Sequence, residues 1–324
     1  MVPTSPDPAF KCRLSHCAGG GGSGGGNSDR KKVRTNVKFR HWLKSKDWKL
    51  LQVSKGAMAD MVVAISAVPE NSLQRYVIYV KTGVYKKYVE VSNSKSNIMI
   101  IGDSIDVTII SGNRNYVDGW TMVSSATFGV LGQGFIAGDM TFENTTGPQK
   151  YQVVAFRSSS DHSVIYRCAI RGYQDTLFSL SLCQFCRESQ IIGTVDFIFG
   201  GGTVVFQKCQ ILVRKAESDV TNPTYLGRPW KKNSRMIIME SYLSDAIRLE
   251  GWLEWKRSLY LDILFYAEYM NNEPGADLGG RVKWPGYHII KDSAQVKQFT
   301  VARFISGDTW LPSTGVKYKD DLAI

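Results

Sequence analysis

A short pattern recurs in the middle of the chain at intervals of 20 to 22 residues. Gln152, Gln174 and Asp196 follow one another at a spacing of 22 residues. The longer recurring segments are Tyr166–Ile170, Arg187–Ile191 and Gln207–Ile211, and also Gly172–Asp175 and Gly193–Asp196. A period of this length predicts a solenoid, in which each repeat forms one coil. The repeats are strand-like and have no helices between them, so the expected fold is all-β, a single-stranded parallel β-helix.

Short apolar runs broken by Gly, Asn, Asp and Ser support this fold class. They are rich in β-branched and aromatic residues, as short strands are. The predicted strands include Tyr76–Val80, Ile98–Ile101, Val107–Ile110, Val153–Phe156, Phe197–Phe199, Val204–Phe206 and Met236–Met239. Helical periodicity is convincing only from Met58 to Val68, which predicts one short N-terminal helix.

The repeat has a chemical consequence, because residues one period apart stack on the same face of a solenoid. Successive coils lie about 4.8 Å apart, the ordinary distance between strands. We therefore expect four polar residues to cluster on three adjacent coils. They are Gln152, Gln174, Asp175 and Asp196.

Two of these residues are candidate catalytic carboxylates. Asp196 lies between the apolar Val195 and Phe197, where a carboxylate is costly unless it is paired or hydrogen-bonded. By itself, Asp196 also fits a structural Asp held by backbone donors. A second carboxylate on the neighbouring coil, Asp175, would repel it and raise the pKa of one of the two. One ionised and one protonated carboxyl group are what acid–base chemistry near neutral pH requires.

Amide, cationic and aromatic side chains complete the candidate site. Gln152 and Gln174 carry donors that suit a developing oxyanion, although a buried Gln also fits a structural ladder. Arg228 is suited to pair with Asp196 and keep it ionised and oriented. Trp230 offers a platform for a sugar ring. The alternative for the segment that contains Arg228 and Trp230 is a surface turn rich in Gly and Pro.

Composition restricts the class of partner. The chain has 324 residues, with 40 Lys and Arg against 29 Asp and Glu, and a formal charge of +11. A hydrophobic content of 43% excludes wholesale disorder. No apolar run approaches the ~18 residues that a membrane-spanning helix needs, so we expect no membrane partner. The charge favours a polyanion, either nucleic acid or an acidic lipid or polysaccharide, without choosing among them.

The N-terminal part does not read as a folded domain. The tract Gly19–Gly26 is typical of flexible linkers. The basic cluster Arg30–Arg34 fits a solvated charge run or, alternatively, a nucleic-acid patch. We expect a disordered leader over residues 1–46 and a β-helix domain over residues 47–324. No apolar stretch of the kind a signal peptide requires lies near Met1, which favours either an intracellular chain or an N-terminus that is not the natural one.

The motifs resemble those of the plant pectin methylesterases (pectinesterases), from about Trp48 to Trp310. The segments that carry the resemblance are Gly172–Leu177, Gly193–Gly200, Tyr225–Lys231, Gly251–Trp255 and Tyr266–Tyr269. The resemblance implies a right-handed parallel β-helix, and the repeat indicates a β-helix independently. It also implies hydrolysis of methyl esters of homogalacturonan (pectin) in the extracellular cell wall, without a metal or another cofactor.

The resemblance assigns a role to each candidate residue. Asp196 corresponds to the nucleophile that attacks the ester carbonyl. Asp175 corresponds to the acid that protonates methanol and then to the base that activates water. Gln174 corresponds to the oxyanion stabiliser, so these three form the catalytic set. The implied substrate-binding residues are Gln152, Arg228, Trp230 and Met122.

Two departures from the family affect single positions. Met122 stands where the family has a Thr in the substrate cleft. The family's disulfide partner of Cys168 falls on Ser189, so that disulfide should be absent unless Cys183 or Cys186 substitutes.

The largest departure is a deletion, since only 15 residues separate Cys209 from Tyr225. Family members have a further coil of roughly 20 residues or more there. Removing a whole coil can leave a continuous stack, but we expect it to move Arg228 and Trp230 relative to Asp196. A displacement of about 1 Å can cost about 100-fold in rate, so reduced or absent activity is predicted. Salt-bridge contact between Arg228 and Asp196 would indicate that the deletion is tolerated. The pro-region of longer members is not intact either.

Several functions therefore compete. The first is a monomeric pectinesterase with methyl-esterified pectin as substrate and a proteinaceous inhibitor as a further partner. The second is a catalytically impaired β-helix that binds pectin without turnover, as the deletion and Met122 suggest. A glycosidase that uses Asp175 and Asp196 is a third, and a nucleic-acid binder is a fourth. We favour the esterase, because the paired Gln residues suit an acyl oxyanion, and we expect no nucleic-acid partner.

Overall fold

The computed structural model describes residues 48–53, 60–214, 223–255, 260–272, 274–291 and 300–319. The leader expected over residues 1–46 lies outside this part of the chain. The boundary between leader and β-helix domain therefore stays a prediction. Residues 215–222, which adjoin the deletion, lie outside the described part as well.

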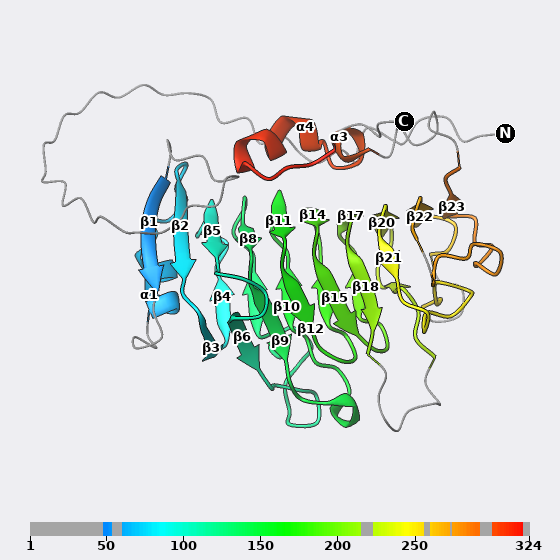
Figure 1. Cartoon of the computed structure of the whole chain (residues 1–324), viewed down its shortest axis with the longest axis horizontal. Coiled ribbons are helices and arrows are strands. Elements are labelled where there is room, and N and C mark those ends of the chain that lie inside the picture. Colours follow the sequence, from blue (N-terminus) through cyan, green and yellow to red (C-terminus); the bar gives the residue numbers. More distant parts are fainter. Residues whose placement is uncertain are drawn as a thin grey trace, which may run out of the picture.

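Three parallel sheets form the faces of one elongated stack of coils (Figure 1). Sheet A contains β1 (Trp48–Val53), β2 (Arg75–Val80), β5 (Ile98–Ile101), β8 (Ile136–Gly138), β11 (Ser163–Tyr166), β14 (Cys183–Arg187), β17 (Thr203–Gln207), β20 (Arg235–Met239), β22 (Phe265–Tyr269) and β23 (Tyr287–Ile289). Sheet B contains β3 (Gly83–Lys86), β6 (Thr108–Gly112), β9 (Thr141–Asn144), β12 (Ala169–Arg171), β15 (Gln190–Gly193), β18 (Gln210–Val213) and β21 (Tyr242–Leu243). Sheet C contains β4 (Val89–Val91), β7 (Phe128–Val130), β10 (Phe156–Ser158), β13 (Leu177–Ser179), β16 (Ile198–Gly200) and β19 (Arg228–Pro229). The parallel β-helix expected from the repeat is confirmed.

The sequences of the strands in sheet A are continuous apolar runs because of where this sheet lies in the fold. Alternate residues of a strand point to opposite faces of a sheet, and here both faces are buried. Ile100, Ile165 and Phe206 belong to the core inside the coils. Their neighbours Val164 and Val205 belong to a second apolar cluster on the outer face. Strands buried on both faces are expected to lack a polar alternation.

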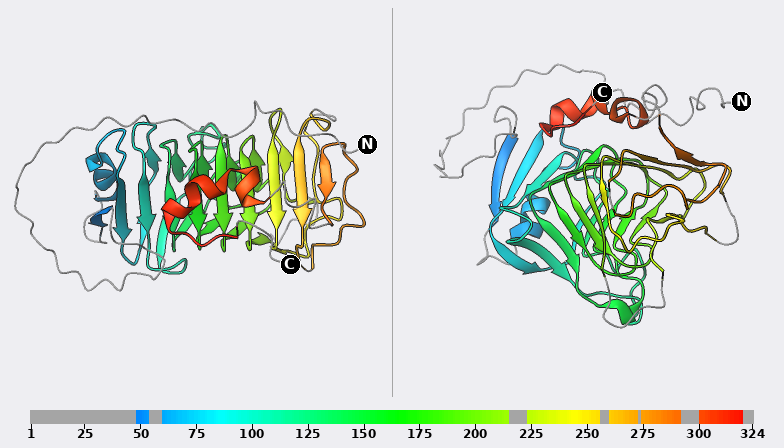
Figure 2. Two further views of the ribbon diagram at one scale, coloured as in Figure 1. Left: turned by 90° about the horizontal axis from the view of Figure 1, so that it is seen from above. Right: turned by 45° about the vertical axis from the view of Figure 1, so that its right-hand side comes forward.

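Short C-terminal helices cover that outer face (Figures 1 and 2). They are α3 (Val301–Phe304), α4 (Gly307–Trp310) and the 3₁₀ helix η4 (Leu311–Thr314), and a further 3₁₀ helix, η2 (Pro148–Lys150), precedes β10. Val301, Phe304 and Leu311 join the outer apolar cluster of sheet A. The sequence pattern did not predict these helices, because four residues are too few to display helical periodicity.

The helix predicted near the N-terminus is confirmed as α1 (Asp60–Ala67). Its Met61 and Ile65 pack into the core within the coils, so α1 covers the beginning of the stack. Among the helices in the described ranges, none is long and apolar enough to cross a membrane.

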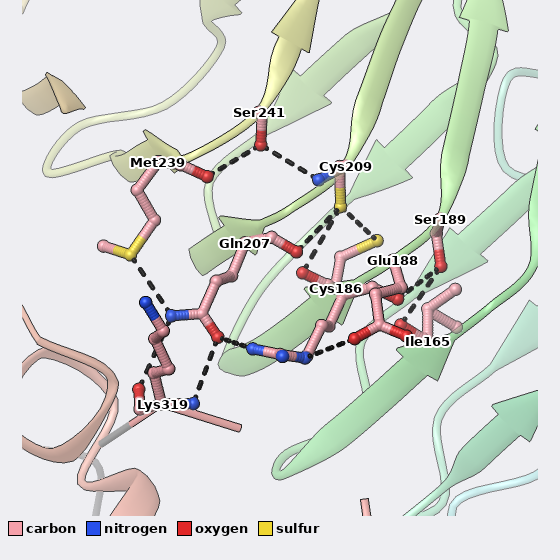
Figure 3. Close-up of polar contacts among 10 residues, drawn as sticks. Ile165, Cys186, Glu188, Ser189, Gln207, Cys209, Met239, Ser241 and Lys319 are labelled. Atoms are coloured by element: carbon pink, nitrogen blue, oxygen red, sulfur yellow. Dashed lines mark hydrogen bonds and ion pairs between the residues drawn. The ribbon is translucent and has the colours of Figure 1, made fainter. Parts of the chain in front are cut away.

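Gln207, at the end of β17, fixes the chain that follows the C-terminal helices (Figure 3). Its side-chain nitrogen donates to the carbonyl oxygen of Lys319 at 3.5 Å, and its side-chain oxygen accepts from the backbone N–H of Lys319 at 3.3 Å. The Lys319 Nζ atom donates to Glu240 at 3.1 Å. Two coils of sheet A are thereby joined to a distant part of the sequence.

Three buried cysteines, Cys168, Cys186 and Cys209, are free thiols. The expectation that the family's disulfide at Cys168 is absent is therefore confirmed, and neither Cys183 nor Cys186 bonds to Cys168 in its place. Ser189 accepts a hydrogen bond from the backbone N–H of Cys168 at 3.1 Å instead. The sulfur atoms of Cys186 and Cys209 lie 3.8 Å apart in neighbouring coils (Figure 3).

The deletion leaves the stack continuous. Each strand before it pairs directly with a strand after it: β16 with β19, β17 with β20, and β18 with β21. The coil after the deletion therefore occupies the next position in the solenoid, as the sequence analysis considered possible.

Candidate active site

The two candidate carboxylates stack in adjacent coils, where the chain enters sheet C. The backbone N–H of Asp175 donates to the carbonyl of Val195 at 3.1 Å. The N–H of Leu177 donates in the same way to Phe197, at 2.8 Å, and Leu177 pairs with Ile198. Applied to the first of these bonds, this pattern of parallel strands pairs Asp175 with Asp196.

The equal spacing of 22 residues between Gln152, Gln174 and Asp196 does not mean that all three residues stack on one another. The N–H of Val153 donates to the carbonyl of Gln174 at 3.1 Å, which pairs Gln152 with Gln174. Two successive residues, Ala155 and Phe156, both donate to the Thr176 carbonyl, at 2.9 and 3.2 Å. The first coil therefore accommodates one extra residue. The two Gln residues stack on each other, whereas Asp196 stacks on Asp175 rather than on Gln174.

Both carboxylates occupy a backbone conformation that few residues adopt. Asp175 has φ +64° and Asp196 has φ +54°. Asp and Asn are enriched in this left-handed region among residues other than Gly. The turn into sheet C therefore has the same shape in the two coils, and it gives both side chains the same direction.

Arg228 binds one of the two carboxylates. Its Nε donates to the Oδ1 atom of Asp196. Arg228 lies in β19, at the edge of sheet C, and pairs with Phe199 of β16. The preceding Gly227 allows this approach, because a Cβ atom there would lie only 2.3 Å from the Ile198 carbonyl. Pro229 is tolerated in β19 because an edge strand need not donate outward.

Burial and charge shift the two carboxyl groups unequally. Asp175 is 3% exposed and Asp196 is 6% exposed. Burial raises the pKa of Asp175 well above its usual value, the charge of Asp196 raises it further, and Arg228 lowers it only in part. Burial also raises the pKa of Asp196, but both the charge and the hydrogen bond of Arg228 oppose that rise. Asp175 therefore keeps its proton to a higher pH than Asp196, which ionises more readily.

Gln152 and Gln174 lie in register beside the carboxylates, and both are half-buried. Neither side-chain amide has a hydrogen-bond partner within the part of the chain that the structure describes. Their N–H groups are thus available to a bound molecule. Free amide donors beside a pair of carboxylates are suited to bind an oxyanion.

An aromatic wall borders the carboxylates. Phe178 and Phe199 stack at 4.4 Å between ring centroids, and the Trp230 ring meets them edge-on at 5.8 and 5.3 Å. Trp255 lies 5.0 Å from Trp230, and the Arg228 guanidinium lies 5.3 Å from the Trp255 ring. Met122 packs against the same apolar cluster. The predicted Trp230 and Met122 therefore pack against one apolar cluster, and Trp255 connects Trp230 with Arg228.

The structure overturns one expectation. The sequence predicted that the deletion would move Arg228 and Trp230 relative to Asp196, yet Arg228 contacts Asp196 directly. The reason is the direct pairing of β16 with β19, which places the later coil at the ordinary strand spacing. Salt-bridge contact between Arg228 and Asp196 is the result expected if the deletion is tolerated, so the deletion is tolerated at this contact.

Sequence analysis missed three aromatic residues of the site. Phe178 and Phe199 recur 21 residues apart, so the repeat contained the signal that places them together. Trp255 lies in the segment Gly251–Trp255, which had been noted only for its resemblance. No spacing connects it with Trp230, and only the fold brings the two rings together.

Glu268 lies in one of the segments that resemble the family, Tyr266–Tyr269, and its contacts are structural. Glu268, in β22, is buried and accepts hydrogen bonds from Trp252 Nε1 at 3.1 Å and from the Tyr287 hydroxyl at 2.9 Å. It also pairs with Arg281, whose Nε lies 2.9 Å away. These bonds connect the last coils with one another and involve none of the candidate site residues.

Comparisons with known proteins point to one family. The family model for pectinesterase matches residues 50–222 and 214–308. A pectinesterase/pectinesterase inhibitor of Prunus persica is 51% identical over 333 residues, covering 87% of this chain and 64% of the relative. Pectinesterase 2.2 of Solanum lycopersicum is 46% identical, covering 87% of this chain and 60% of the relative. The pectin methylesterase from carrot is 39% identical, with a TM-score of 0.75, and the match covers 84% of this chain and 98% of that structure.

A buried pair of carboxylates, one of them bound to an Arg, thus lies on a parallel β-helix of the pectinesterase type. The chain belongs to the pectinesterase family. It spans less than two thirds of the length of these two curated relatives.

Proposed function

We propose that this protein is a pectin methylesterase, which hydrolyses methyl esters of homogalacturonan and releases methanol. One observation carries the proposal. Two buried carboxylates, Asp175 and Asp196, stack in adjacent coils, and Arg228 binds only Asp196. The arrangement separates a nucleophile from an acid within one small space.

In the first half of the reaction, an ionised Oδ atom of Asp196 attacks the carbonyl carbon of the methyl ester. Arg228 orients that carboxylate and helps to keep it ionised. Negative charge develops on the carbonyl oxygen, where the amides of Gln174 and Gln152 donate hydrogen bonds. Asp175 gives its proton to the methoxy oxygen, so that methanol leaves and an acyl–Asp196 anhydride remains.

In the second half, Asp175 is ionised and takes a proton from water. The resulting hydroxide attacks the acyl carbon, and the bond to Asp196 breaks. The polysaccharide leaves with a free carboxylic acid group, which ionises and releases its proton to water, while Asp196 is ionised again and Asp175 is protonated again. One water is consumed and one methanol is formed, and the step uses only this chain's side chains.

The substrate is an acidic polysaccharide in this proposal. The aromatic wall of Phe178, Phe199, Trp230 and Trp255 offers flat surfaces for sugar rings. The formal charge of +11 favours approach to an anionic chain. We place the protein in the extracellular cell wall on the basis of its family, with a proteinaceous inhibitor as a further partner and the monomer as the active form. The names of two relatives, which join pectinesterase with pectinesterase inhibitor, support that choice of partner.

The test measures two products from highly methyl-esterified pectin. Methanol release without new reducing ends is the expected result. New reducing ends without methanol would assign the same two Asp residues to glycoside hydrolysis. Pectin binding without either product would favour a binding protein that does not turn over its ligand. The contact between Arg228 and Asp196 argues against that alternative.

A further inference from the structure

A second concave site lies on the face of sheet C at some distance from the catalytic pair. It is a cavity of about 260 Å³ beside β4 and β7. Its lining includes Tyr88, Glu90, Arg114, Val123 and Gly129. The site residues described above do not line it.

One row of paired residues connects this cavity with the catalytic site. Crossing sheet C from β4 to β19, the row consists of Glu90, Gly129, Arg157, Phe178, Phe199 and Arg228. Six strands at about 4.8 Å per step place the two ends of the row about 24 Å apart. A polymer lying along this row would contact the aromatic wall and the cavity together.

Arg114 lines the cavity, and its guanidinium contacts two aromatic rings. Its central carbon lies 3.7 Å from the ring centroid of Tyr88 and 3.7 Å from that of Trp120. The Tyr88 hydroxyl donates to the Asn113 side-chain oxygen at 2.8 Å, and the backbone N–H of Trp120 donates to the Asn115 carbonyl at 3.2 Å, which holds the turn that carries the indole ring. Both rings lie within cation–π distance of the guanidinium, whose N–H groups form its outer edge.

That edge is largely unused. Arg114 makes one long hydrogen bond, 3.5 Å to the Ser124 carbonyl, and has no acidic partner within the described ranges. The acid that lines the cavity, Glu90, is paired with Arg157 at 2.7 Å. The cavity thus has an excess of one positive charge. A flat guanidinium with a free edge is suited to bind a carboxylate with two parallel hydrogen bonds.

We infer that this cavity is a distant subsite for the carboxylate of an unesterified uronic acid unit, with Arg114 as its recognition residue. The inference rests on the proposed function, which supplies both the polymer and the carboxylate. Each turnover converts a neutral ester into an anion, so the subsite binds units of the product type. It thereby favours chains that are already partly de-esterified over fully esterified ones.

Binding of unesterified oligogalacturonates tests the subsite without any turnover. The probes are a dimer and a decamer, measured calorimetrically with the full chain. For Arg114→Gln we expect the Kd of the decamer to rise about tenfold, the typical loss for one charge-assisted contact. The dimer is too short to reach from the aromatic wall to the cavity, so its Kd should rise by much less.

Two further variants separate recognition from folding. Val123→Asp places a carboxylate at the cavity without removing any ring contact, since Val123 is 47% exposed. It should weaken decamer binding and leave the thermal midpoint unchanged. Lys208→Gln removes a positive charge on another face, beside the junction of sheets A and B, and should leave decamer binding within about twofold.

Decamer binding that is equally tight in wild type, Arg114→Gln and Val123→Asp would overturn the inference, as would an equal fold-loss for dimer and decamer. Absence of decamer binding by the wild type would overturn it too. Methanol release is measured separately. If methanol is released but decamer binding does not depend on Arg114, only the subsite is refuted. If decamer binding depends on Arg114 but no methanol is released, only the esterase proposal is refuted.

Discussion

Asp175 stacks on Asp196 in the next coil, yet the cation Arg228 binds only Asp196. This asymmetry determines how protons are distributed between two carboxyl groups that share one turn geometry. Asp175 lacks the direct ion pair and is the more buried of the two, so it retains its proton to a higher pH. The pKa of Asp175 therefore rises more than the pKa of Asp196, so Asp196 loses its proton first as the pH increases.

The raised pKa of Asp175 predicts a cost in stability. The folded pKa lies above the unfolded value of about 3.9, so stability is fully present below that value and is lost as the pH rises through the folded pKa. Asp175→Asn removes the cost of ionising a buried group. We expect its thermal midpoint to exceed that of the wild type at neutral pH, and the difference to shrink below about pH 4.

Thermal unfolding between acidic and neutral pH checks this expectation. Asp262→Asn is the matched control, because Asp262 is an exposed carboxylate. A constant difference between Asp175→Asn and wild type at every pH would contradict the assignment of the raised pKa to Asp175.

The contact of Arg228 with Asp196 leads to a prediction for the acid limb of the pH–rate profile. Its positive charge lowers the pKa of Asp196, so Arg228→Gln should raise that pKa and protonate the nucleophile over a wider range. The acid limb of kcat/KM should move to higher pH, and the loss of activity should be largest at low pH. Arg228→Lys retains the charge and should move the limb less. A uniform loss at all pH values would indicate that Arg228 only positions substrate.

The two Gln residues differ in their expected contributions. Gln174→Ala should lower kcat about 100- to 1000-fold, the usual effect of losing an oxyanion donor. Gln152→Ala should lower kcat less and raise KM, because Gln152 is also a predicted substrate contact. Steady-state methanol release measures both effects. Full kcat in Gln174→Ala would assign the oxyanion to other donors.

The repeat made much of this architecture predictable. A period of 20 to 22 residues indicated a β-helix and brought Asp175 next to Asp196, because strand pairing repeats the same side-chain positions in every coil. It did not predict that Ala155 and Phe156 share one acceptor, which depends on local backbone geometry. Trp255 has no periodic partner, so only the three-dimensional path of the last coils places it near Trp230.

The expected displacement of Arg228 was wrong for a physical reason. A deletion inside a globular core changes every distance across it, whereas a solenoid has interfaces only between neighbouring coils. When a whole coil is missing, the following coil pairs in its place at the same spacing, as β19 does with β16. The contact between Arg228 and Asp196 therefore persists.

The buried pair of Glu268 and Arg281 predicts a large stability effect away from the site. Both side chains are 1% exposed, and Arg281→Met would leave the Glu268 charge without its cation. We expect a loss of about 3–5 kcal/mol in the free energy of unfolding. Arg171→Met is the matched control, because its pair with the exposed Asp106 is worth less than about 1 kcal/mol. Denaturant unfolding measures both variants, and equal losses would contradict the special role of the Glu268 network.

The most direct test compares methanol release from methyl-esterified pectin by the wild type and by Asp196→Asn. Asparagine retains the shape of the side chain but cannot form an acyl intermediate by the same attack. The account predicts methanol release by the wild type and a loss of about 1000-fold or more in Asp196→Asn, with the thermal midpoint preserved. Full turnover by Asp196→Asn, or no methanol from the folded wild type, would contradict it.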